Sequence, residues 1–183
     1  MIEIRDLSVK LGDKQVFDRY SVSIPDTGIV LIQGESGIGK TTLLRVLCGL
    51  QTPDSGEIRG LAGRKISVVF QEQRLLDHLT ALDNVAIVSD KAKAESLLKS
   101  LNMEQELKSK AANLSGGQKQ RVSIARAFAF SDDVVLLDEP FTGLDEQNKA
   151  RAAELIRTAR LALVVTHEAE DRQLLHFDAK ITF

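Results

Sequence analysis

The chain has 183 residues, 43% of them hydrophobic, which is enough to build the buried core of one domain. It carries 24 lysines and arginines against 26 aspartates and glutamates, and this near-neutral balance gives no overall attraction to nucleic acid or to an anionic membrane. Since the sequence shows neither a basic leader followed by an apolar stretch nor an apolar run of roughly twenty residues, we expect one cytosolic domain over residues 1–183.

The N-terminal region has the alternating apolar pattern of half-buried strands. Residues 2–11 and 16–24 follow this pattern, and Gly12-Asp13 lies between them, so an antiparallel hairpin is predicted. Turn-forming residues at 25–28 then lead into the fully apolar run 29–32, which is typical of a buried strand.

Residues 34–41, with the sequence GESGIGKT, follow that strand and fit the phosphate-binding pattern G-x-x-x-x-G-K-[ST]. Glycines let backbone N–H groups surround an anion, and the helix that follows points the positive end of its dipole at the same place. Lys40 can reach the outer phosphates, and the Thr41 hydroxyl can bind magnesium. An ordinary glycine-rich turn is the alternative, but the flanking strand and helix disfavour it. The predicted nucleotide-binding residues here are Gly34, Glu35, Ser36, Gly37, Ile38, Gly39, Lys40, Thr41 and Thr42.

The helix predicted after this loop contains Cys48, the single cysteine, which excludes an internal disulfide. Its position favours a small core residue over a reactive thiol. Turn formers at 51–56 end the region, after which residues 57–59 can return to the antiparallel sheet and residues 66–70 can form another buried strand.

The middle of the chain, about residues 71–113, changes to helical spacing of apolar residues over 79–88 and 91–101 and predicts an inserted helical subdomain. Ser115 is a candidate N-cap for a helix over 118–130. Apolar runs at 134–137, 161–165 and 179–183, with a helix over 146–160, complete the pattern. Strands alternating with helices predict an α/β fold with a mainly parallel sheet. Residues 1–70 and 114–183 would form its core.

Two carboxylates, Asp138 and Glu139, follow the apolar strand 134–137. Ligands of open α/β sheets bind at the carboxyl ends of strands, so we expect both side chains beside the phosphate loop. Asp138 could hold magnesium, and Glu139 could take a proton from an attacking water. In isolation, Asp-Glu-Pro after a strand would more often be an exposed turn, but the phosphate loop reverses that preference.

The start of the next motif, residues 114–118, places glycines and a hydroxyl at a helix N-terminus, which suits an anion and also fits an ordinary capped helix. This Leu-Ser-Gly-Gly-Gln run, followed by 120–122 (QRV) and 125–127 (ARA), resembles the signature of the ATP-binding-cassette family. The resemblance extends over nearly the whole chain, with the motifs in the family's order.

The resemblance implies a P-loop NTPase that uses ATP and Mg²⁺. Residues 34–41 are similar to the Walker A motif, residues 134–138 to Walker B, and 142–145 to the D-loop with Asp145. Gln71 resembles the glutamine that contacts the magnesium site and links it to a membrane partner, and His167 resembles the switch histidine that contacts the γ-phosphate. The implied catalytic residues are Lys40, Glu139 and His167, and the implied metal ligands are Thr41, Gln71 and Asp138.

In that family, two domains pair head to tail, with the signature of one facing the Walker loop of the other. The residues implied to act across the dimer are Ser115, Gly116, Gly117 and Gln118. The family also implies a homodimer or a heterodimer with a second ATPase subunit, separate transmembrane permease subunits, and a peripheral position on the inner face of the cell membrane. Residues 71–76 and 79–85 resemble the coupling region of bacterial transport ATPases, which leaves the cargo unnamed.

The chain departs from the family pattern at the adenine site. An aromatic residue usually precedes the first hairpin glycine, and Leu11 stands there instead, so adenine would rest on an aliphatic surface or use Phe17. The helical subdomain is also short, and little chain follows His167, from which we expect no C-terminal regulatory domain.

Two other classes of function fit a cassette. One is a soluble ATPase acting on nucleic acid or ribosomes, but we expect no nucleic-acid partner, because the chain lacks a basic stripe, a long coiled-coil insertion and a second cassette. The other is a regulatory module that binds nucleotide without hydrolysis, which the presence of Glu139 and His167 disfavours.

Overall fold

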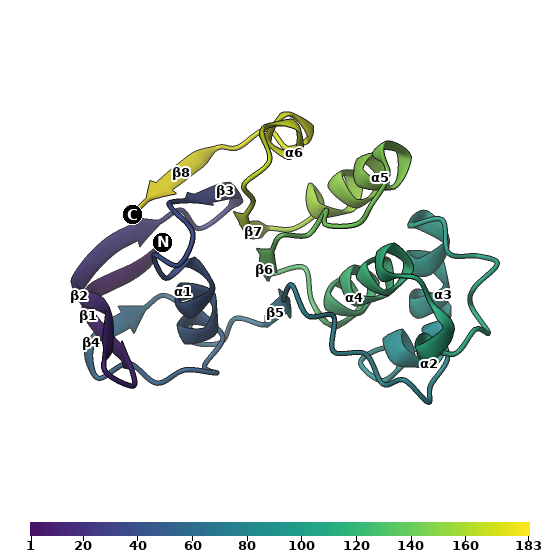
Figure 1. The fold of residues 1–183 in the computed structure, drawn as a ribbon, viewed down its shortest axis with the longest axis horizontal. Helices are drawn as coiled ribbons and strands as arrows, with labels where there is room; N and C mark the ends of the chain where they lie inside the picture. Colours follow the sequence, from purple (N-terminus) through teal and green to yellow (C-terminus); the bar gives the residue numbers. More distant parts are fainter.

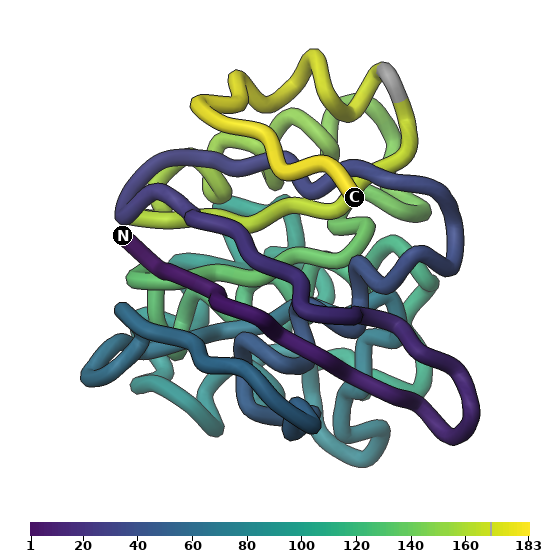
Figure 2. Tube along the Cα trace, turned by 90° about the vertical axis from the view of Figure 1, so that its left-hand side faces the viewer, coloured from purple at the N-terminus to yellow at the C-terminus, as the bar shows by residue number. Residues whose placement is uncertain are grey.

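The computed structural model describes residues 1–168 and 170–183, and its N-terminal layer is the predicted antiparallel sheet. The strand order is β2-β1-β4, with the bounds β1 Ile2–Leu11, β2 Lys14–Ile24 and β4 Ser55–Arg59. Gly12 turns the β1–β2 hairpin with a φ of 59°, a conformation that favours glycine. Figure 2 shows this hairpin, in purple, crossing the face turned toward the viewer.

The second sheet is parallel throughout, as predicted, and has the order β5-β6-β7-β3-β8. Its strands are β3 Gly28–Gln33, β5 Ile66–Val69, β6 Val134–Asp138, β7 Leu161–Val165 and β8 Ala179–Thr182. The helices are α1 Lys40–Leu47, α2 Ala81–Ala86, α3 Lys91–Ser100, α4 Gly116–Phe130, α5 Glu146–Ile156 and α6 Ala169–Leu174, with a 3-10 turn at Ala111–Asn113. Figure 1 shows α1 and the antiparallel strands at one end of the molecule and α2, α3 and α4 at the other.

Both faces of the parallel sheet are buried. In β6, Val134 and Leu136 pack with α1 and the antiparallel sheet, while Val135 and Leu137 pack with the helices on the opposite face. Burial on both faces explains why β6 and β7 are unbroken apolar runs instead of alternating ones. Cys48 packs against the first of these clusters while staying partly exposed, and burial raises the pKa of its thiol.

Some helix boundaries differ from the predicted ones. Helix α2 begins at Ala81, two residues after the predicted start, because the Thr80 hydroxyl caps it by accepting a hydrogen bond from the Asp83 N–H. Helix α5 ends at Ile156 and not at residue 160, since Arg160 already belongs to the connection that enters β7 and donates its N–H to the Asp132 carbonyl. The short helix α6 was not predicted.

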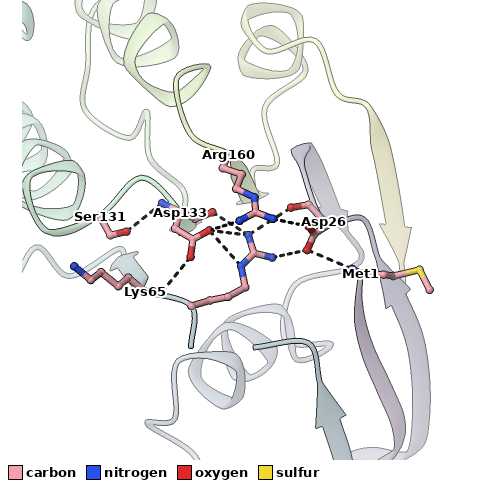
Figure 3. Close-up of polar contacts among 7 residues, drawn as sticks. Met1, Asp26, Lys65, Ser131, Asp133 and Arg160 are labelled. Atoms are coloured by element: carbon pink, nitrogen blue, oxygen red, sulfur yellow. Dashed lines mark hydrogen bonds and ion pairs between the residues drawn. The ribbon is translucent and has the colours of Figure 1, made fainter. Parts of the chain in front are cut away.

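A ring of ion pairs joins the amino ends of the parallel strands (Figure 3). Arg64 Nη1 lies 2.9 Å from Asp26 Oδ1, and its Nη2 lies 3.0 Å from Asp133 Oδ1. Arg160 closes the ring, at 2.6 Å from Asp26 Oδ2 and 3.4 Å from Asp133 Oδ1. These residues precede β3, β5, β6 and β7, so the ring fixes four strand starts relative to one another.

We predict that Arg64→Met lowers the free energy of unfolding by about 2 kcal/mol, because the largely buried guanidinium bonds two carboxylates and two carbonyl oxygens. Hydrogen bonding by Arg64 lowers the pKa of Asp133, so this stability exists above the ordinary aspartate value of 3.8 and is lost as the pH falls through the lowered one. Urea unfolding at pH 7 and at pH 3 measures both effects. Arg59→Met, at an exposed pair with Glu57, is the control and should cost under about 0.5 kcal/mol. Equal losses would contradict the prediction.

Candidate functional site

Strand register brings the predicted motifs together at the carboxyl ends of the parallel strands. Strands β6, β7 and β3 are neighbours, and Val165 lies opposite both Asp138 and Ile32. The segments that leave these strands therefore emerge side by side at their carboxyl ends. They carry the loop 34–41, Glu139 and His167, and Asp138 is the last residue of β6.

A cavity of about 470 Å³ lies at these carboxyl ends, and residues of the β1–β2 hairpin form part of its wall. Of the residues predicted from the sequence, those that line it are Leu11, Ser36, Gly37, Gly39, Lys40, Thr41, Thr42, Gln71, Asp138, Glu139 and His167. Gly34, Glu35 and Ile38 belong to the same loop but do not appear in the cavity wall as the structure describes it.

Lys40 is buried at the start of α1, and the loop folds around its side chain. Its ammonium donates hydrogen bonds to the carbonyl oxygens of Gly34 at 2.9 Å and Glu35 at 2.7 Å. Burial lowers the pKa of Lys40, and the nearby Glu139 and Asp138 carboxylates partly oppose this effect. An anion in the cavity would therefore meet an ammonium held ready by the loop backbone.

Gly39 shows why this loop requires glycine. Its φ is 120°, and a Cβ added there would lie 2.7 Å from Cγ1 of Val16 and 3.0 Å from the ring of Phe17. The loop thus packs directly on β2, which a side chain at this position would prevent.

The predicted metal ligands lie together. The Thr41 hydroxyl donates a 2.6 Å hydrogen bond to Asp138 Oδ2, and Gln71 lines the same cavity. A hydroxyl, a carboxylate and an amide carbonyl are all oxygen donors, which hard divalent cations such as Mg²⁺ prefer. The residues present therefore fit a magnesium ion.

Glu139 has the properties of a general base. Its φ is 51°, and its Oε1 is shielded from solvent with no hydrogen-bond partner among the described residues. Burial raises the pKa of Glu139, with a smaller contribution from Asp138, while the backbone N–H of His167 opposes the shift. The imidazole Nε2 of the half-exposed His167 lies 3.6 Å from Oε1. A carboxylate with a raised pKa next to an imidazole is suited to take a proton from water.

The structure does not favour the alternative in which adenine uses Phe17. Phe17 is only 4% exposed, lies beneath Gly39, and stacks on Tyr20 with ring centroids 5.3 Å apart. Leu11, in contrast, is 42% exposed and lines the cavity together with Lys14 and Val16. Among the described residues, the cavity wall near the hairpin therefore consists of the aliphatic side chains of Leu11 and Val16 and the ammonium of Lys14. No aromatic ring lines this part of the described wall.

The residues 115–118 lie at the start of α4 and are not part of the cavity wall that the structure describes. Ser115 and Gln118 form a capping box, in which each side chain accepts a hydrogen bond from the other's backbone N–H. The Ser115 oxygen accepts in this contact, so its O–H remains able to donate. A Cβ built at Gly117 would overlap the carbonyl oxygen of Gly143, so the signature packs against the segment that leads to Asp145. Asp145 itself caps α5 by accepting from the Asn148 N–H.

Gln120 and Arg126 have a place in the family resemblance, but the sequence did not predict that they hold neighbouring loops. Gln120 is buried, donates to the carbonyl of Pro140 at 3.1 Å and accepts from Gln73 at 3.1 Å. Arg126 donates to the carbonyls of Gln73 and Arg74. The signal for both was a polar residue within an otherwise apolar helical stripe. Together they connect the segment after Gln71 to the segment after Glu139.

Comparison with known proteins agrees with the motifs. A family model described as ABC transporter matches residues 17–142. The chain is 39% identical, over 90% of its length, to the probable sulfate/thiosulfate import ATP-binding protein CysA of Chlorella vulgaris, and it covers 78% of that protein. It is 36% identical, over 93% of its length, to the sulfate/thiosulfate import ATP-binding protein CysA of Escherichia coli strain K12, of which it spans about half, 54%.

A solved structure is also similar. The ATP-binding cassette MJ0796, in a dimeric post-hydrolysis state bound to ADP and Pi, matches with a TM-score of 0.84 and 27% identity. The match covers 96% of this chain and 91% of that one. Within residues 1–168 and 170–183, we find no helix whose length and hydrophobicity would allow it to cross a membrane.

We predict that Glu139→Gln raises the free energy of unfolding by about 1 kcal/mol at pH 7 without added ligand, because it removes a buried charge. The pKa of Glu139 is raised in the folded chain, so its ionised form costs stability above that pKa. The difference between variant and wild type should vanish below the ordinary glutamate value of 4.5. Urea unfolding at pH 7 and pH 4 measures it. Glu154→Gln, at an exposed position of α5, is the control, and a Glu139 variant no more stable than this control would refute the prediction.

Proposed function

The chain belongs to the ABC transporter family, and from this premise we propose that it is an ATP-hydrolysing cassette that powers transport through separate transmembrane subunits. The observation that carries this proposal is the shared cavity at the ends of β3, β6 and β7. A phosphate loop, a pair of carboxylates and a histidine meet there, and these groups can bind phosphates and activate a water for phosphoryl transfer.

The proposed reaction is attack of water on the γ-phosphorus of ATP. The bond from that phosphorus to the oxygen shared with the β-phosphate breaks, giving ADP and phosphate, and Glu139 accepts the proton that the water releases. Lys40 and the N-terminal end of α1 stabilise the negative charge on the phosphate oxygens. A magnesium ion held by Thr41, Asp138 and Gln71 would add positive charge at the same oxygens.

The cavity supplies only half of the site that the motifs describe, since residues 115–118 are not in its described wall. We therefore propose that two cassettes pair around ATP, each offering its Ser115 hydroxyl and the N-terminus of α4 to the nucleotide on the other. The similar cassette MJ0796 is described as dimeric. Homodimers and heterodimers both satisfy this arrangement.

We also propose that the cassette works on the inner face of the cell membrane, attached to a permease. The two relatives from Chlorella vulgaris and Escherichia coli are named for import, which supports uptake as the direction of transport. Affinity purification from detergent-solubilised membranes tests this assignment. A multispanning membrane protein that copurifies would support it, whereas recovery with ribosomes or nucleic acid would favour the soluble ATPase class.

We predict that Glu139→Gln, with ATP and Mg²⁺, lowers the hydrolysis rate by about 100-fold or more and accumulates an ATP-bound dimer, because the proton acceptor is lost while the phosphate contacts remain. Phosphate release measures the rate, and light scattering measures the mass. Lys40→Ala is the control and should remain monomeric, since it loses the ammonium that faces the phosphates. Unchanged hydrolysis by the Glu139 variant would rule out its role as base.

We predict that Leu11→Tyr lowers the KM for ATP about fivefold with little change in kcat, because an aromatic ring would stack on adenine with about 1 kcal/mol. The wild type should use GTP nearly as well as ATP, since the side chains at this end of the cavity are Leu11, Lys14 and Val16. Steady-state kinetics with both nucleotides measure the effect. Leu50→Tyr, at an exposed leucine outside the cavity wall, should leave both KM values unchanged. Strong preference for ATP in the wild type would contradict an aliphatic base site.

A further inference from the structure

We propose that Lys149 is a positioning residue for His167, acting through a buried ion pair that holds the histidine's loop on α5. The inference rests on the proposed ATPase function and deepens it by naming a residue outside the cavity wall. The sequence predicted that Lys149 lies on the helix 146–160, and none of the motifs assigned it a role.

Contacts of Lys149 involve residues that precede and follow His167 in the sequence. Lys149 Nζ lies 2.7 Å from Asp171 Oδ1 and 3.0 Å from Glu168 Oε2. The other oxygen of Asp171 accepts a 3.3 Å hydrogen bond from the Thr166 hydroxyl. One ammonium is therefore connected to the residue before His167 and to the residue after it.

This pair is buried to a degree that marks it as more than a surface contact. The side chain of Lys149 is 10% exposed and that of Asp171 is 3% exposed. Hydrogen bonding to Asp171 raises the pKa of Lys149, so the charged form persists in the folded chain. Burying two charges costs desolvation that an apolar pair would avoid, and what a charged pair adds is a fixed geometry.

The imidazole of His167 needs this support because it has little of its own. Its ring is half-exposed, and the polar contact that the described residues give it is the 3.6 Å approach to Glu139. A further contact, from Arg172 Nη2, is made to the backbone carbonyl at 3.2 Å. The position of the ring is therefore set by the backbone on either side of it, which is where Lys149 acts.

The support comes from the start of α5, where the D-loop ends. The Lys149 N–H donates to the carbonyl of Asp145 at 2.8 Å, within the turn that the Asp145 side chain caps. His167 is thus held by an element whose N-cap, Asp145, is the last residue of the D-loop motif.

A double-mutant cycle tests the proposal. Steady-state ATPase kinetics are measured for the wild type, Lys149→Met, His167→Ala and the combination of both substitutions. Lys149→Met should lower kcat about tenfold and leave the KM for ATP within about twofold, because a misplaced group costs rate while the phosphate contacts stay intact. In the His167→Ala background, Lys149→Met should cause no further loss, and Lys149→Arg should recover most of the wild-type kcat.

Two further variants separate positioning from loss of stability. Lys149→Met with Asp171→Leu removes the unpaired buried carboxylate, so it should fold well and still have a low kcat. Arg64→Met breaks a buried network at the far edge of the sheet and should lower stability while kcat, measured well below the unfolding temperature, stays unchanged.

Different results would overturn the role of Lys149 and the proposed ATPase function. If the wild type does not hydrolyse ATP, or if His167→Ala keeps full activity, the proposed roles and the inference both fail. If His167→Ala is impaired but Lys149→Met is not, or if the two losses multiply in the combined variant, the inference alone is overturned.

Discussion

The parallel register of β6, β7 and β3 is the constraint on which the site depends. Asp138, Val165 and Ile32 lie in one row across three hydrogen-bonded strands, so the segments that follow them begin at the same height. Burial of both faces holds this row, because a slip of one residue would exchange the two apolar clusters on either side of the sheet. The approach of Thr41 to Asp138 and that of His167 to Glu139 are therefore set by core packing as well as by local contacts.

Two sets of ion pairs act at opposite ends of this sheet. The ring around Arg64 joins the connections that enter the strands, and the pair of Lys149 with Asp171 joins segments near the carboxyl ends. The first ties four strands to one another and lies far from the cavity. The second ties α5 to α6, beside the loop that carries His167. Ion pairs thus stabilise the sheet at the amino ends of its strands and orient His167 near the carboxyl ends.

The sequence predicted what is encoded locally. The phosphate loop, the strand that ends in Asp138 and the cap at Ser115 each lie within a few residues, and the structure shows the expected elements at each. Contacts between distant segments were not predictable in the same way. The burial of Phe17 follows from the loop that packs on β2, and the end of α5 follows from contacts of Arg160 with residues before other strands. Lys149 received no role from the sequence because its partners, Glu168 and Asp171, come from a later segment.

The close approach of Gly117 to Gly143 has a consequence for reading variants of the signature. The backbone of one motif occupies the space that a side chain on the other would need, so any larger residue at 117 must displace the chain near Asp145. Loss of activity in such a variant would not isolate the proposed contact with a phosphate, because two motifs would have moved together. Ser115, whose cap contact is local to α4, is the position at which the proposed anion contact can be varied without moving the second motif.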